Sequence, residues 1–141
     1  LLREAEAAGL VHLTGNVESG HNFICNCCGC CCGVLRSMNE FNLTNIVNSH
    51  FYAEIEEEEC NNCGICLDER CQVRAIEDTD ATYRVIKERC IGCGLCITTC
   101  PTDAIRLVHK PQEEIITPPR DMNAWNDERA RQRSADYSAY K

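Results

Sequence analysis

The 141-residue chain has 14 cysteines, a formal net charge of −8 and only 6% aromatic residues. The acidic balance argues against nucleic acid as a partner, because proteins that bind nucleic acid present basic patches. No segment approaches the roughly 20 apolar residues that a membrane-spanning helix needs, so we expect no membrane insertion. So many cysteines around so thin an apolar core indicate either disulfide staples or metal sites.

The chain opens with a predicted helix. Residues 1–8 are strong helix formers, and Gly9 after them is a typical helix stop. The sequence begins at Leu1 rather than at a methionine. We therefore expect a piece of a longer protein, whose targeting signals would lie outside this sequence.

A dense block of six cysteines follows. They are Cys25, Cys27, Cys28, Cys30, Cys31 and Cys32. Cys25, Cys28 and Cys31 are spaced at intervals of three, which is typical of metal ligation rather than of disulfide bonding. A polar, asparagine-rich stretch comes next, over residues 37–49.

From residue 51 the chain repeats itself. Tyr52 and Tyr83 each begin a short strand-like segment ahead of a cysteine run, and the runs begin 30 residues apart. The first run is Cys60, Cys63, Cys66 and Cys71, and the second is Cys90, Cys93, Cys96 and Cys100. We predict that each half forms a short strand, a cysteine loop, about one and a half helical turns and another strand. The fold class would be α+β, with pseudo-two-fold symmetry.

Three cysteines at intervals of three, with a fourth further on before a proline, form the run that holds cubane iron–sulfur clusters. Residues 52–110 accordingly resemble a bacterial-type ferredoxin with two [4Fe–4S] clusters. The resemblance implies that the fourth ligand crosses between the halves. One cluster would bind Cys60, Cys63, Cys66 and Cys100, and the other would bind Cys90, Cys93, Cys96 and Cys71.

The first run departs from the ferredoxin pattern in two ways. Four residues, not three, separate Cys66 from Cys71, and Gln72 stands where a proline is usual. Proline fixes the backbone direction after the ligand, so we expect a different path around Cys71. We still expect Cys71 to be a ligand; the alternative is a three-cysteine site that holds [3Fe–4S] or has a labile corner.

Three interpretations of the upstream block remain open. It holds a third iron–sulfur cluster, with a fourth ligand from Cys32, His21, His12 or an upstream segment. It holds zinc, as a single site or a zinc–thiolate cluster. Or its thiols are free, because their partners lie outside this sequence.

Three regions are thus predicted: a helical and cysteine-rich metal-binding segment over 1–50, a ferredoxin domain over 51–110 and an extended polar tail over 111–141. A short polar helix is expected within the tail, over residues 121–133. The block ahead of a ferredoxin module also resembles, more loosely, the C-terminal part of larger multi-cluster proteins of anaerobes.

The expected function is electron transfer through two [4Fe–4S] clusters, as a module of a larger redox protein. The alternative is an oxidoreductase whose upstream block, Cys25 to Cys32, binds a metal or a substrate and receives electrons from the cubanes. The acidic module would dock on redox proteins that have basic surfaces. Oxygen-sensitive clusters and numerous thiols favour the reducing cytoplasm.

Overall fold

The computed structural model describes residues 1–136 and 138, in two compact units. One unit contains Leu1–Leu13 and Cys25–Ile115, and the other contains Thr14–Ile24 and Ile116–Lys141. Residues 137 and 139–141 of the predicted tail lie outside the described residues. Within the described residues, no helix is both long and apolar enough to cross a membrane.

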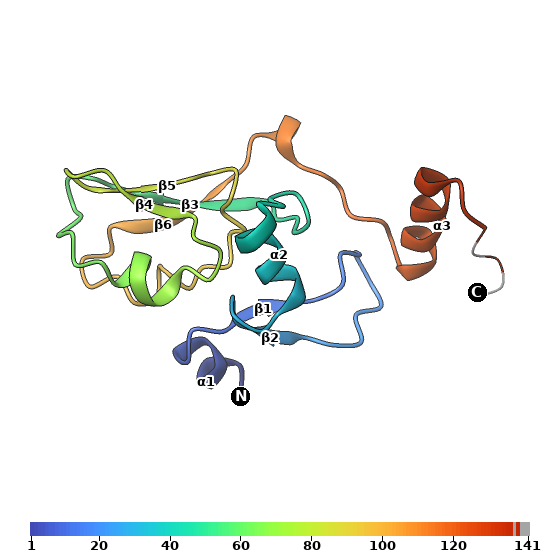
Figure 1. Ribbon diagram of the computed structural model, residues 1–141, viewed down its shortest axis with the longest axis horizontal. Coiled ribbons are helices and arrows are strands. Elements are labelled where there is room, and N and C mark those ends of the chain that lie inside the picture. Colours follow the sequence, from blue (N-terminus) through green and yellow to red (C-terminus); the bar gives the residue numbers. More distant parts are fainter. Residues whose placement is uncertain (137, 139–141) are drawn as a thin grey trace. The chain divides into compact units, whose positions relative to one another are not determined.

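The four strands of the ferredoxin-like region pair across its two halves (Figure 1). Strand β3 (Phe51–Ile55) pairs antiparallel with β6 (Ile105–His109), and β4 (Ile76–Asp78) pairs antiparallel with β5 (Tyr83–Val85). The first strand of the region therefore lies beside the last, and the two middle strands form a hairpin. These strands occur where the repeat predicts them, and the α+β class is confirmed.

The predicted helical turns after the two cysteine loops differ from each other. In the first half, Cys66–Arg70 form a single π-helical turn, η1, closed by the Cys71 N–H donating to the Cys66 carbonyl at 3.1 Å. A π-turn holds one more residue than an α-turn, so the residue inserted before Cys71 is absorbed there. The second half forms tighter turns rather than a helix, with the Cys100 N–H donating to the Ile97 carbonyl at 3.1 Å.

The N-terminal part of the first unit contains α1 (Leu2–Ala7), β1 (Val11–Leu13), β2 (Cys25–Cys27) and α2 (Gly33–Phe41). Helix α1 ends where Gly9 predicts, at a φ of +76°. Helix α2 begins before the asparagine-rich stretch and ends within it, and the sequence did not predict it. It forms because Leu35 and Met38, one turn apart, are fully buried against Val11 of β1 and the loops of the ferredoxin region.

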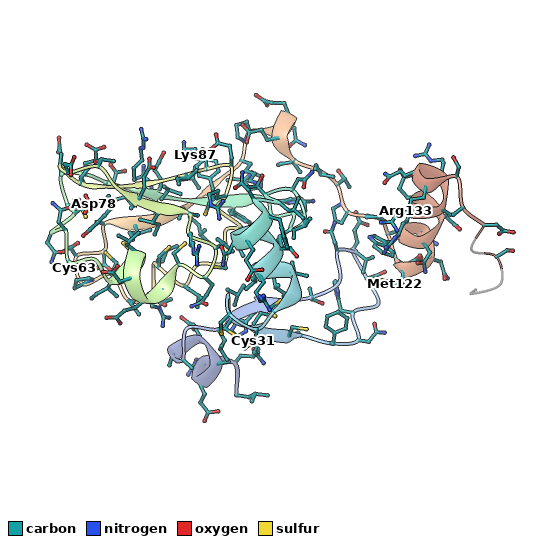
Figure 2. All side chains as sticks on the ribbon, in the orientation of Figure 1. Cys31, Cys63, Asp78, Lys87, Met122 and Arg133 are labelled. Carbon is teal, nitrogen blue, oxygen red and sulfur yellow. The ribbon has the colours of Figure 1, made fainter. Side chains whose placement is uncertain are left out.

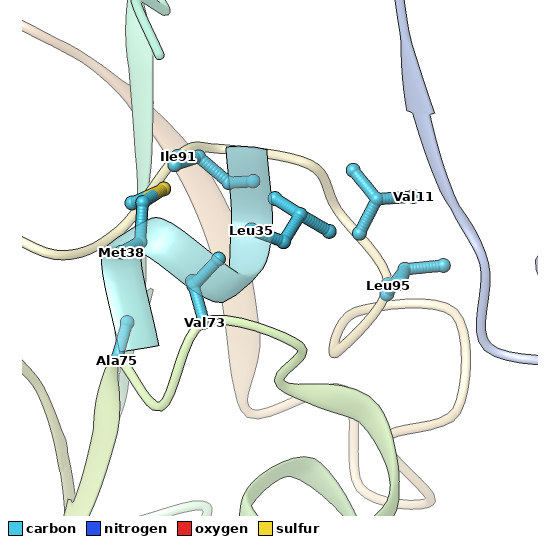
Figure 3. Close-up of a cluster of buried hydrophobic side chains, with 7 residues drawn as sticks. All are labelled: Val11, Leu35, Met38, Val73, Ala75, Ile91 and Leu95. Carbon is cyan, nitrogen blue, oxygen red and sulfur yellow. The ribbon is translucent and has the colours of Figure 1, made fainter. Parts of the chain in front are cut away.

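This burial creates a hydrophobic core that joins the N-terminal segments to the ferredoxin region (Figure 3). Its members are Val11, Leu35, Met38, Val73, Ala75, Ile91 and Leu95. In Figure 1, α2 lies between the β1–β2 ladder and the four ferredoxin strands. The Arg89 guanidinium strengthens the junction by donating to the carbonyl oxygens of Met38 and Val73, at 3.4 and 2.9 Å. Contacts thus cross the predicted boundary at residue 50.

The second unit contains α3 (Met122–Arg133), close to the predicted polar helix. Asp121 caps its N-terminus by accepting from the Ala124 N–H at 2.9 Å. The Glu18 and Ser19 N–H groups donate to the carbonyls of Pro119 and Arg120, so the tail pairs with an early loop of the chain. The 3-10 turn η2 (Gln112–Glu114) precedes α3 in the chain and belongs to the first unit.

Arg70 is a charged side chain that is 94% buried, with 6% of its surface exposed. Its guanidinium donates to the carbonyls of Leu95, Ala7 and Glu6, at 3.1, 3.3 and 2.8 Å. Hydrogen bonds from a charged donor contribute about 1.5–3 kcal/mol each. When the guanidinium is removed, the carbonyls at the end of α1 can bond to water instead, which offsets part of the loss. We expect Arg70→Met to lower the free energy of unfolding by about 2–4 kcal/mol.

The test is anaerobic thermal unfolding, followed by circular dichroism and visible absorbance at a fixed scan rate. Arg36→Met is the matched control, because Arg36 forms only an exposed ion pair with Glu40, which contributes less than about 1 kcal/mol. Equal effects of the two substitutions would contradict the role given to Arg70.

Candidate iron–sulfur sites

Four cysteines from the two halves of the ferredoxin region line one pocket, the Cys60 pocket. Cys60, Cys63 and Cys66 come from the segment between β3 and β4, and Cys100 precedes β6. Tyr83 and Ile105 contribute apolar surface to the same wall. These four cysteines are the set that the ferredoxin resemblance assigns to one cluster.

The remaining four cysteines line a second pocket, the Cys71 pocket. Cys90, Cys93 and Cys96 lie between β5 and β6, and Cys71 follows η1 in the other half. The wall also includes apolar side chains, among them Val73 and Ile91. The extra residue before Cys71 does not carry it away from the pocket, because the π-turn takes it up. All eight cysteines are free thiols, and their ligation stays a prediction.

Backbone N–H groups point at the sulfur atoms in the Cys71 pocket. The Ala75 N–H donates to Cys71 Sγ at 3.1 Å, and the Ala53 N–H donates to Cys90 Sγ at 3.3 Å. Such hydrogen bonds stabilise thiolate charge and help to set the potential of a bound cluster. Sequence reasoning missed these donors, because every residue except proline has an N–H and no residue type marks them.

Burial makes several of these thiols reluctant to ionise. It raises the pKa of Cys66 to about 11, with added repulsion from Cys60 and Cys63. It raises the pKa of Cys96 to about 12, and the nearby Cys93 adds to the effect. Burial also raises the pKa of Cys100, but N–H donors led by Thr102 outweigh it and leave the pKa below its ordinary value. The cations of a cluster would supply the positive charge that buried thiolates need.

The donor sets therefore fit iron–sulfur clusters: two groups of four thiols, in apolar surroundings, with N–H donors at the sulfurs. Residues 53–107 match the family model of the 4Fe-4S dicluster domain. This stretch is a ferredoxin module of the 4Fe-4S dicluster type. The match contains the eight cysteines of both pockets, and it confirms the family resemblance.

Two relatives place the ferredoxin module in different settings. The chain is 33% identical to an uncharacterized ferredoxin of Methanocaldococcus jannaschii over 97 residues, which are 67% of this chain and 57% of that protein. It is 29% identical to the archaeal-type NADPH glutamate synthase of Dehalococcoides mccartyi over 66 residues, which are 46% of this chain and 13% of that enzyme. The chain thus spans less than two thirds of either relative.

The structure divides the six upstream cysteines into two groups. Cys28, Cys30 and Cys31, the Cys28 trio, have Sγ atoms that all lie within 4.8 Å of one another. Cys30 Sγ lies 2.9 Å from Cys28 Sγ and 3.4 Å from Cys31 Sγ. The hydrogen bond with Cys30 lowers the pKa of Cys28 to about 7.

The other three cysteines form a separate group around β2. Burial raises the pKa of Cys27 to about 12, and its thiol neighbours Cys32 and Cys25 add to this rise. The triplet Cys25, Cys28 and Cys31, singled out by its spacing, is therefore split between the two groups. The reason is local: alternate residues of a strand share a face, so Cys25 and Cys27 lie together on β2.

The two candidate histidine ligands have other partners. A His12 ring nitrogen lies 2.7 Å from the Asn26 side-chain oxygen, and a His21 ring nitrogen lies 3.2 Å from the Thr14 hydroxyl. Of the histidine, cysteine and acidic residues that the structure describes, none joins the Cys28 trio within the 4.8 Å limit.

Gln72 connects the upstream block to the ferredoxin module. Its side-chain oxygen accepts from the Gly29 N–H at 2.8 Å, and its carbonyl accepts from Asn39 Nδ2 at 2.9 Å. The ferredoxin pattern has proline at this position, which has no side-chain acceptor. The departure at Gln72 was the sequence signal for this contact, although its partner was not predictable.

Proposed function

We propose that the ferredoxin module binds two [4Fe–4S] clusters and passes single electrons between redox partners, as part of a larger redox protein. The observation that carries the proposal is the pair of four-cysteine pockets, each with three cysteines from one half and the fourth from the other. Each set supplies the soft thiolate ligands that a cubane requires.

The arrangement between the pockets suits electron transfer from one cluster to the other. Cys66 of the Cys60 pocket and Cys96 of the Cys71 pocket belong to one buried apolar cluster. The side chains packed with them come from the strands: Ala53, Ile76, Val85 and Ile105. Two clusters held by these cysteines would be neighbours across a dry, close-packed interior, so an electron entering at one could continue to the other.

The surface charge supports basic redox partners. Residues 52–110 contain twelve acidic and seven basic side chains, and each bound cubane with four thiolates adds about two further negative charges. A groove along β3 and β5 is lined by four glutamates, with Arg84 and Lys87 as the basic side chains. Electrostatic attraction would steer this face towards a basic docking surface, more strongly at low salt.

The setting in a larger redox protein is supported by the glutamate synthase relative, in which the matching segment is 13% of a long enzyme. The cytoplasm is the proposed compartment, because reduced thiols persist there.

The expected metal content is about eight irons and eight acid-labile sulfides per chain after anaerobic reconstitution. Reduction should give an EPR spectrum of two interacting spins, because the clusters are neighbours. About four irons per chain, or zinc in place of iron in the two pockets, would contradict the proposal. Mass spectrometry under native conditions supplies an independent count of the bound ions.

A second candidate function is favoured by the geometry of the upstream block. The convergence of the Cys28 trio, and its contact with Gln72 beside Cys71, support a further metal centre that receives electrons from the cubanes. The two clusters would then serve chemistry at that centre.

A further inference from the structure

We propose that Cys28, Cys30 and Cys31 bind a single thiophilic metal ion, iron or zinc, with one coordination position left open, and that Gln72 holds this site against the Cys71 pocket. The placement beside a cluster rests on the proposed function, whereas the ion site itself does not. Beyond that function, the proposal names the ligands, the number of metal ions in the site and the contact that joins the site to the Cys71 pocket.

The sulfur spacing indicates one ion rather than a cubane. Tetrahedral bonds of about 2.3 Å place two sulfurs of one ion about 3.8 Å apart. The Cys28 trio, with all its sulfurs within 4.8 Å of one another, needs only small adjustments to meet this geometry. Among the described residues, no three sulfurs of the Cys60 and Cys71 pockets gather within that limit, as expected for ligands around a larger object.

The backbone around the trio favours anionic sulfur. The Cys32 N–H donates to the Cys28 carbonyl at 3.2 Å, which folds the three cysteines into a turn directly before α2. The positive end of the dipole of this nine-residue helix therefore faces the segment that holds the thiols. Three thiolates around one divalent cation would also relieve their mutual repulsion.

The site is accessible from outside. Cys30 and Cys31 are exposed, and Cys28 is half-buried. Figure 2 labels Cys31, beside β2, and Cys63, in the ferredoxin loops, and shows them well apart within the first unit. With three protein ligands, the ion would keep a fourth position for water or an external ligand, as catalytic zinc sites do.

The connection to the ferredoxin module is short. Gly29 lies between Cys28 and Cys30, its N–H donates to Gln72 Oε1, and Gln72 is bonded to Cys71. A Cβ atom at Gly29 would collide with the Gln72 carbonyl oxygen and lie 3.1 Å from Asn39 Nδ2. This position therefore requires glycine for the close approach of two backbones. One hydrogen bond thus joins the segment that contains the trio to the residue that follows Cys71, a predicted cluster ligand.

The first test counts zinc bound by the cluster-loaded protein, by dialysis against free zinc and elemental analysis. We expect one zinc per chain in the parent and in Cys25→Ser, and at least 100-fold weaker binding in the Cys28→Ser, Cys31→Ser double variant. Cys25→Ser is the matched control, because it removes an exposed thiol outside the trio.

Three results would overturn the site. The first is that the parent binds no zinc in addition to its two iron–sulfur clusters, and the second is that Cys25→Ser loses as much zinc binding as the double variant. The third is about four extra irons and sulfides after reconstitution, which indicate a cubane. The same analysis reports the eight irons of the ferredoxin module, so failure of the ion site and failure of the proposed function are distinguishable. Reconstitution with iron alone decides whether the ion is iron or zinc.

The second test compares Gly29→Ala with Gly33→Ala. A Cβ at Gly33 meets nothing within 4 Å, whereas one at Gly29 forces the turn away from Gln72. Gly29→Ala should weaken zinc binding about tenfold and change the EPR spectrum of the cluster in the Cys71 pocket; Gly33→Ala should do neither. A Gly29→Ala spectrum identical to the parent's would overturn the connection through Gln72.

Discussion

A Cys63→Ala, Cys100→Ala double variant should retain about four irons and four sulfides per chain, whereas a Cys93→Ala, Cys100→Ala double variant should retain almost none. In the first variant both changes fall in the Cys60 pocket, so the Cys71 pocket keeps its four thiols. In the second, each pocket loses one ligand. Alanine is chosen because a serine oxygen can replace a thiolate.

The measurement is anaerobic iron and sulfide analysis of both variants, reconstituted side by side. Cys25→Ala is the control and should retain about eight irons, because it changes neither pocket. If each cluster instead took its four ligands from one half, the two outcomes would be exchanged. The comparison therefore tests the crossed pairing directly, and a general loss of stability cannot imitate it.

Gly92→Ala should be the most destabilising single substitution of a glycine in the ferredoxin module. Gly92 lies between two cysteines of the Cys71 pocket at a φ of +61°. A Cβ there would collide with the Phe51 carbonyl oxygen and lie 2.8 Å from Ser49 Oγ. Backbone strain of about 1 kcal/mol and overpacking of about 1–3 kcal/mol should add to roughly 3 kcal/mol, and β3 should lose its position beside the loop.

Gly9→Ala is the control that separates the cost of backbone strain from the cost of overpacking. Gly9 has a φ of +76°, but a Cβ there meets its nearest atoms at 3.7 Å, an ordinary van der Waals distance. We expect it to cost only the strain, about 1 kcal/mol. The check is the anaerobic melting temperature, with the rate at which visible cluster absorbance is lost on dilution into air. Similar values for Gly92→Ala and Gly9→Ala would show that the collision with Phe51 is relieved at little cost.

Strong local signals predicted several elements correctly. Helix α1 and its stop at Gly9 follow from helix propensity and glycine, and Asp121 marks the start of α3. The strands of the module follow from its internal repeat. Helix α2 could not be predicted in this way, because its sequence is rich in polar residues and its stability depends on the burial of Leu35 and Met38.

The sequence alone also predicted the chemistry of the two pockets. Cysteines at intervals of three need little chain to surround one object, so a local pattern is enough to indicate an iron–sulfur cluster. The four-residue gap before Cys71 predicted a different backbone path around that residue. Its form, a π-turn that returns Cys71 to the pocket, depends on the strands that fix both ends of the segment.

Only the tertiary structure decided how the upstream block is arranged. Its six cysteines fit several patterns, and the pairing of β1 with β2 places Cys25 and Cys27 apart from the Cys28 trio. The contact between Gly29 and Gln72 joins residues 43 positions apart. Spacing within a loop restricts which ligands one short segment can offer, but contacts between distant segments depend on which surfaces bury each other when the chain packs.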